Sequence, residues 1–255
     1  MRTVSRISIA PVKSLALQHP DEVRIESFGI AADRFFYLVD RTGRLFSGSL
    51  FGPLTAIRPE YDPGQEWLTL HFPDGEAVSG DAAFLGEPIE TGIWGRPITG
   101  HVVGGAFAEA LSRFAGRPIR LARVDRPGDG VDSQPISVLS DASVEELARR
   151  SGRTEPLDGR RFRMTVGVAG CTAHEEDTWI GHDVRVGEAV IRVTRPDGRC
   201  VVTTRDPETG VRDFDTLRAI RAYRGVRDER KIDFGVYARV AEPGRVRVGD
   251  RVEPI

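Results

Sequence analysis

The sequence predicts a mainly β protein with a few helices, of the α+β class, built from two β-barrel-like halves. Short segments that alternate apolar and polar residues recur along most of the chain, as half-buried strands do. Turn-forming runs rich in Gly, Pro and Asp separate these segments at short intervals, which is typical of barrels and sandwiches. Helical periodicity is confined to three stretches.

Four strands and one helix are expected in the first half of the chain. The segments VSRISI and VRIESF alternate, a denser apolar run follows, and WLTLHF alternates again. The expected strands are residues 4–9, 23–28, 35–39 and 67–72, and a short helix is expected over 107–114. The segment Asp125–Gly130 is rich in turn formers, so it marks the boundary between a domain of residues 1–125 and a domain of residues 126–255.

The second half is expected to be another barrel with two helices. A strand over 136–139 leads into a helix that starts near residues 140–143, where Ser143 and Glu146 match a capping box and Asp141 is a competing cap. A second helix is expected over 215–223. The expected strands are residues 164–168, 184–186, 189–193, 201–204, 234–240 and 246–252.

Composition excludes several classes of protein. The 38 acidic and 36 basic residues give a net charge of −2, without the basic excess of a nucleic-acid-binding chain. The opening segment MRTVSRISIAPVKSLAL has no apolar run long enough for a secretory signal or a spanning helix. We therefore expect a soluble, cytoplasmic protein with no nucleic-acid partner and no membrane contact.

The chain has two cysteines, Cys171 and Cys200, which neither make a disulfide framework nor hold a four-thiolate iron–sulfur cluster. Taken alone, a free cysteine is usually a small buried residue. Cys200, however, directly follows Arg199 at the end of a turn, where cationic surroundings favour the thiolate. A thiolate is a soft ligand that suits softer metals. Cys171 is interpreted as structural.

Other charged or hydroxyl groups also lie next to turns. Taken singly, each has an ordinary interpretation as a surface ion pair or a solvated strand edge. Zinc-protease, dinucleotide, Walker and nucleophile-elbow motifs do not occur in the sequence. The stretches that carry these groups are Pro11–Ser14, Asp33-Arg34, Arg160–Arg163 and Pro196–Cys200.

Together these stretches resemble the MOSC domain family. Arg160–Arg163, Gly198–Thr204, Phe234–Tyr237 and Gly244–Asp250 resemble the MOSC domain itself, the C-terminal domain type of molybdenum cofactor sulfurases. The stretch from Arg199 to Gly210, RCxxTTxDPxTG, is long and specific. Upstream, the PVKS and DR elements are similar to the β-barrel domain that precedes MOSC in one branch. That branch includes mitochondrial amidoxime-reducing components and bacterial proteins that detoxify N-hydroxylated bases such as hydroxylaminopurine.

The resemblance implies a molybdenum–pterin cofactor and a role for particular residues. The Cys200 thiolate would bind molybdenum, and Asp132 matches an acidic position near the metal that can relay protons or hold a metal-bound water. A phosphate-bearing pterin suits Lys, Arg and hydroxyl partners. Thr165, Gln134 and Gly198 depart from the family pattern, which affects pterin hydrogen bonding rather than the metal ligand. The implied cofactor-binding residues are Lys13, Ser14, Arg34, Arg163, Arg199, Thr203 and Tyr237.

The function that the resemblance implies is reduction of N-hydroxylated or other N-oxygenated small molecules. The chain has no flavin or nicotinamide fingerprint, so we expect a separate electron donor, either ferredoxin-like or a flavin reductase. An alternative is a carrier of the molybdenum cofactor or a sulfur-transfer protein with a Cys200 persulfide. A third possibility is a β-rich binding protein without a metal, which leaves the joint pattern of motifs unexplained.

Overall fold

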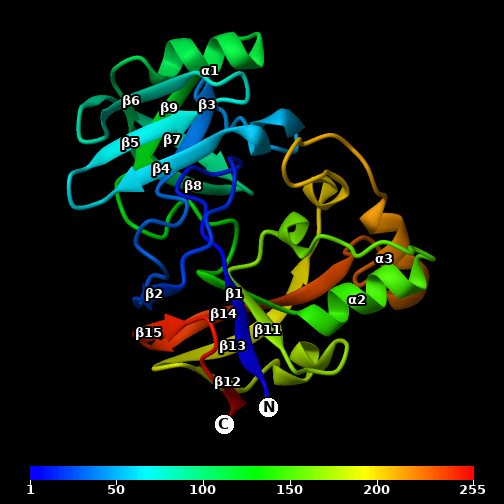
Figure 1. The fold of residues 1–255 in the computed structure, drawn as a ribbon. Helices are drawn as coiled ribbons and strands as arrows, with labels where there is room; N and C mark the ends of the chain where they lie inside the picture. The colour runs from blue at the N-terminus through cyan, green and yellow to red at the C-terminus, as the bar shows by residue number, and fades with distance from the viewer.

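A computed structural model describes residues 1–255, and it has two lobes built mostly of strands with three α-helices (Figure 1). The first lobe contains the strands β3 to β9 and the helix α1. The second lobe contains the strands β1, β2 and β10 to β16 and the helices α2 and α3. This architecture confirms the predicted mainly β fold with a few helices.

The first lobe consists of two antiparallel sheets, in the orders β3-β9-β8-β7 and β4-β5-β6. A core of 24 buried residues fills it, and Phe36, Tyr37 and Phe107 are among its largest side chains. Its elements are β3 Phe36–Asp40, β4 Arg58–Asp62, β5 Trp67–His71, β6 Ala77–Asp81, β7 Leu85–Ile93, β8 Arg96–Val103, α1 Phe107–Ala115 and β9 Ile119–Val124.

The second lobe is built on a seven-stranded sheet in the order β1-β11-β10-β14-β13-β12-β16, with a separate pair of strands, β2 and β15. Its helices α2 and α3 contact each other beside the sheet, over a smaller core that includes Leu147, Phe162 and Phe234. The elements are β1 Thr3–Ile7, β2 Glu22–Ile25, β10 Ile136–Ser140, α2 Asp141–Arg150, β11 Val166–Ala169, β12 Asp183–Val186, β13 Ala189–Gly198, α3 Thr216–Arg224, β14 Asp233–Glu242, β15 Gly244–Arg247 and β16 Val252–Pro254.

The chain starts in the second lobe and then crosses to the first. β1 pairs antiparallel with β11, and β2 pairs antiparallel with β15 (Figure 1). Val4, Ile7 and Ile25 are buried in the main core of the second lobe. The predicted division between residues 125 and 126 stays a prediction. The structure adds that the two N-terminal strands pack with the C-terminal half, so the segments that follow them lie at the junction of the lobes.

Two predicted strands of the second half are wrong in detail. Residues 201–204 form a 3-10 helix, η4 Val201–Thr204, because the hydroxyl groups of two threonines satisfy carbonyls of the same turn. Thr203 Oγ1 donates to Cys200 O at 3.0 Å, and Thr204 Oγ1 donates to Val201 O at 2.7 Å. The predicted strand over 246–252 is divided between β15 and β16, because Gly249 turns the chain with a φ of +93°.

The cap of helix α2 also differs from the expectation. Ser140, the last residue of β10, is the N-cap, and its hydroxyl accepts a hydrogen bond from Ser143 N at 3.2 Å. Ser143 is not available as a cap because its hydroxyl donates to Glu176 Oε1 at 2.7 Å. Glu146 pairs with Arg149 and Arg150 instead of closing a capping box. No helix of the structure combines the length and the apolar character needed to cross a membrane.

The crossing of β1 and β2 predicts that residues 126–255 do not fold alone. This fragment lacks Val4, Ile7 and Ile25, and burial of each such side chain contributes about 1.5–3 kcal/mol. The sum is comparable with the whole stability of an ordinary domain, about 5–15 kcal/mol. We expect no cooperative thermal transition by circular dichroism, whereas residues 1–30 joined to 126–255 by a flexible linker should restore one. A sharp transition of the isolated fragment would contradict the prediction.

Candidate functional site

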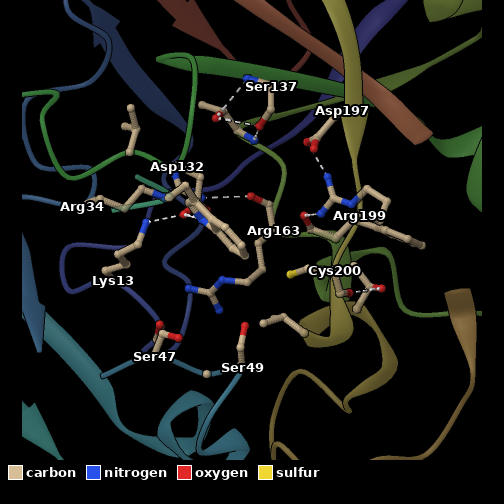
Figure 2. A pocket seen from close by; sticks show the side chains of 18 of the residues that line it. Lys13, Arg34, Ser47, Ser49, Asp132, Ser137, Arg163, Asp197, Arg199 and Cys200 are labelled. Carbon is tan, nitrogen blue, oxygen red and sulfur yellow. Dashed lines mark hydrogen bonds and ion pairs between the residues drawn. The ribbon is translucent and has the colours of Figure 1, made fainter. Parts of the chain in front are cut away.

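A cavity lies at the junction of the two lobes, with an empty space of about 900 Å³ that includes its open mouth. All nine residues that the sequence singled out lie in its wall, although their roles stay predictions (Figure 2). They are Lys13, Ser14, Arg34, Asp132, Arg163, Arg199, Cys200, Thr203 and Tyr237.

Strained backbone is concentrated in the wall of this cavity. Eight non-glycine residues of the chain have a positive φ, and four of them line the cavity. Such conformations crowd the Cβ atom and tend to persist at functional sites, where the surrounding structure imposes them. The four residues are Ser14 at 76°, Arg34 at 51°, Trp94 at 50° and Arg163 at 55°.

Lys13 and Asp132 form an ion pair between the loop after β1 and the loop before β10. Lys13 Nζ lies 2.6 Å from Asp132 Oδ1 and also donates to Gly130 O at 3.0 Å. The surrounding protein raises the pKa of Asp132, but the positive charges of Lys13 and Arg34 outweigh this effect and lower it to about 2. Asp132 is therefore ionised at neutral pH and accepts hydrogen bonds.

Arg163 is the one cation in the wall without a carboxylate partner. Lys13 pairs with Asp132, Arg34 with Asp33, Arg161 with Asp213, and Arg199 with Asp197. Arg163 Nη2 donates only to Leu15 O, at 2.7 Å. Burial and the positive charge of Arg34 lower the pKa of Arg163 to about 10, so it remains charged at neutral pH. An unbalanced cation that lines a cavity attracts an anionic group.

Cys200 stands at the start of η4, with its sulfur turned toward the interior of the cavity (Figure 2). Its side chain is half-buried. Its carbonyl oxygen accepts from Thr203 N at 3.2 Å and from the Thr203 hydroxyl, which also bonds Thr216 Oγ1 at 2.7 Å. Thr203 therefore holds the backbone that presents the thiol. Cys171 lies outside the cavity beside the core of the second lobe, and burial raises the pKa of its thiol to about 12.

Arg199, Asp197 and Tyr237 form a buried polar cluster beside Cys200. The guanidinium of Arg199 pairs with Asp197, donates to Phe162 O and lies 5.6 Å from the centre of the Phe162 ring. Burial raises the pKa of Asp197 to about 6, although the charge of Arg199 and a hydrogen bond with Tyr237 oppose the change. Burial also raises the pKa of Tyr237. The guanidinium of Arg199 therefore links Asp197, at the end of β13, to the backbone of Phe162.

Several residues of the wall were not singled out from the sequence. Asp197 lies in β13, within the Pro196–Cys200 stretch that the sequence predicted to be a turn, and its side chain gave no separate signal. Trp94 occupies a two-residue turn where Asn, Asp or Gly is usual, which is a sequence signal that could have been used. Arg161 is part of the RRFR stretch and binds Asp213 through two hydrogen bonds of 3.1 and 2.9 Å. The remaining polar residues of this group are Ser47, Ser49 and Ser137.

The pKa of Asp132 predicts how stability depends on pH. This pKa is about 2 in the folded protein and near its usual 3.8 in the unfolded chain, so the stabilisation is complete above about pH 4 and disappears as the pH falls toward 2. Asp132→Asn should lower the melting temperature at pH 7 by about 2–4 °C, because the pair contributes about 1 kcal/mol when one partner is half-exposed.

Thermal unfolding of the wild type and of Asp132→Asn at pH 7, 5 and 3 checks this expectation. The difference in melting temperature should be the same at pH 7 and 5 and smaller at pH 3. Asp129→Asn, a change in the same loop at a residue whose carboxylate lies 3.8 Å from the nearest arginine nitrogen, is the control. A difference that is absent at pH 7, or that grows as the pH falls, would show that the charge of Asp132 does not stabilise the fold.

Comparisons with known proteins agree on one family. Residues 125–253 match the model of the MOSC domain, and residues 1–118 match that of the MOSC N-terminal beta barrel domain. Human mitochondrial amidoxime-reducing component 1 is 26% identical over 292 residues, which cover 98% of this chain and 82% of the relative. The Xenopus laevis protein of the same name is 28% identical over 284 residues, covering 98% of this chain and 81% of the relative.

Among solved structures, the YUAD protein from Bacillus subtilis has 14% sequence identity and a TM-score of 0.45, covering 99% of this chain and 94% of that chain. The family matches extend over both halves of the molecule, in the order that the PVKS, DR and RCxxTT stretches indicated. The chain belongs to the MOSC domain family, with the MOSC N-terminal β-barrel domain preceding the MOSC domain.

Proposed function

We propose that this chain is a molybdenum-cofactor-dependent reductase of N-hydroxylated and other N-oxygenated small molecules. One observation carries the proposal: the Cys200 thiol, the unpaired cation Arg163 and the other residues implied by the family resemblance line a single cavity. Relatives named amidoxime-reducing components match nearly the whole chain, which supports this reaction class.

The side chains of the cavity fit a molybdenum–pterin cofactor in their chemistry. The cofactor carries a dianionic phosphate, which Arg163 and the neighbouring hydroxyl groups of Ser14, Ser47 and Ser49 suit. Arg199 keeps a buried Nε without a hydrogen-bond partner in the protein. The sulfur of Cys200 is a soft ligand, and Cys200 lines the cavity.

Each residue has a separate part in the proposal. Cys200 is the molybdenum ligand, and Lys13, Ser14, Arg34 and Arg163 hold the pterin and its phosphate. Thr203 and Arg199 orient the backbone around Cys200, and Tyr237 lines the cavity beside Asp197. When bound, the molybdenum centre supplies two-electron redox chemistry at the substrate N–O bond.

The reaction balances as a two-electron, two-proton reduction. The N–O bond of R–NHOH breaks, a new N–H bond forms, and the oxygen leaves as water, giving R–NH₂. The two protons come from water. Asp132 is ionised at neutral pH because its pKa is about 2, so we assign it to accept hydrogen bonds, to orient polar groups and to relay protons from water rather than to store one itself. The two electrons come from a separate protein, which we propose is ferredoxin-like or a flavin reductase.

The alternative is a carrier of the cofactor or a sulfur-transfer protein. Both functions require Cys200, so the loss of function on changing this residue does not separate them. Turnover separates them, because a carrier loaded with cofactor reduces no substrate. A persulfide on Cys200, detected by mass spectrometry in protein that is inactive as a reductase, would favour sulfur transfer.

The two cysteines provide a matched test of the metal ligand. Protein made in a host that synthesises the cofactor should contain molybdenum in near-equimolar amount, measured by plasma mass spectrometry. Cys200→Ser should lose this molybdenum because a neutral hydroxyl replaces the thiolate. Cys171→Ser should retain it, since Cys171 lies outside the cavity. Equal molybdenum in both variants would contradict the assignment of Cys200.

The need for a separate electron donor predicts a second result. The cofactor-loaded chain should reduce an amidoxime with a chemical donor such as reduced methyl viologen, but not with NADH or NADPH alone, because its sequence has no nicotinamide or flavin fingerprint. Amine or amidine product, quantified by liquid chromatography, is the measurement. Rapid turnover with NADH and no added protein would contradict the expected partner, and no turnover with either donor would contradict the reductase.

A further inference from the structure

A tryptophan at the tip of the β7–β8 hairpin has an unexpected position. Ile93 pairs with Arg96, so Trp94 and Gly95 form a two-residue turn with φ values of 50° and 82°. Two positive φ values define the type of turn in which Asn, Asp or Gly is preferred, because a Cβ atom is crowded there. Trp94 is also 68% exposed, so core packing does not explain a large aromatic residue at this place.

The indole of Trp94 is nevertheless held in one orientation at the cavity. Its Nε1–H donates to Asp132 Oδ1 at 2.7 Å, and the same oxygen accepts from Lys13 Nζ. Arg96, on the other side of the turn, donates to Asp129 O at 2.8 Å and to Val131 O at 2.7 Å. The hairpin of the first lobe is therefore fixed to the loop of the second lobe that carries Asp132, and Trp94 lines the cavity.

We infer that Trp94 is a specificity-determining residue, whose exposed indole face stacks against a planar conjugated group of the substrate while the N–O group enters the cavity. The inference rests on the proposed function, which supplies the reacting group. An aromatic ring that is already oriented loses little conformational freedom when a planar ligand binds. Its face is also available, since the hydrogen bond to Asp132 uses the edge of the indole.

Stacking predicts selectivity between substrates rather than a uniform change in activity. Replacing one stacked aromatic side chain by alanine commonly weakens the binding of a planar ring about tenfold. An aryl amidoxime such as benzamidoxime can use the indole face, whereas acetamidoxime has only a methyl group. The alternative role for Trp94 is to position Asp132 through its N–H group, and that role affects both substrates alike.

Two variants of Trp94 separate these roles. Trp94→Ala removes the ring and the N–H donor, and Trp94→Phe keeps an aromatic face but removes the donor to Asp132. With cofactor-loaded full-length protein and a chemical electron donor, Trp94→Ala should lower kcat/KM about tenfold for benzamidoxime and leave that for acetamidoxime nearly unchanged. Trp94→Phe should keep most of the preference for benzamidoxime. Trp67→Ala, which removes another exposed indole from β5, outside the cavity, is the control.

A binding measurement keeps this test independent of turnover. Calorimetric titration of benzamidoxime without an electron donor should give a Kd about tenfold higher for Trp94→Ala than for the wild type or Trp67→Ala. Equal affinity for these three proteins, or no binding to the wild type, would overturn the role of Trp94. An equal loss of kcat/KM for both substrates in both Trp94 variants would also overturn it, in favour of positioning Asp132. Failure of the wild type to reduce either amidoxime would instead contradict the proposed function.

Discussion

The pairing of β1 with β11 is the constraint on which the cavity depends. This antiparallel pair places Thr3 opposite Ala169 and Ile7 opposite Val166, so the chain begins as an edge strand of the second lobe's sheet. The segment that follows must then pass between the lobes, where Lys13 N donates to Phe36 O at 2.8 Å. Arg163 comes shortly before β11 and reaches Leu15 O, 148 positions away in sequence. Strand pairing thus brings two distant cationic segments to one wall.

Carboxylates of the protein itself neutralise most of the positive charge in this wall. Burying a charge is unfavourable unless a counter-charge or hydrogen bonds compensate for it, and four of the five cations have their own carboxylate. Arg163 is the exception, and its position beside Arg34 increases the local positive potential. An anionic ligand would therefore complete an arrangement that the protein leaves unbalanced. This asymmetry supports the proposal that the cavity binds a phosphate-bearing cofactor.

Asp132 links the cations of this wall to Trp94 at the mouth of the cavity. One carboxylate oxygen accepts hydrogen bonds from Lys13 and Trp94, which belong to different segments of the chain. The loop before Asp132 lies close to the backbone of Arg34, since a Cβ atom on Gly130 would lie 1.9 Å from Arg34 O. Glycine at this position permits the contact. Because Asp132 is ionised, the same residue that orients the cation also fixes the aromatic side chain at the mouth.

The sequence by itself determined the mainly β character, most strands of the second lobe and the three α-helices, but it missed β4, β6, β7, β8 and β9 of the first lobe. The family resemblance indicated the residues of the candidate site, whose roles stay predictions. Alternation, turn residues and the RCxxTTxDPxTG stretch are local patterns, and local backbone preferences express them directly. Only the tertiary structure decided that β1 and β2 join the second lobe, that Lys13 pairs with Asp132, 119 positions away, and that Arg163 has no acidic partner. It also decided that Val201–Thr204 is helical, since hydroxyl bonds to carbonyls outweigh the β propensity of this segment. The strand pairings and the ion pairs depend on which distant segments meet and which charges are buried together, and no local pattern encodes either.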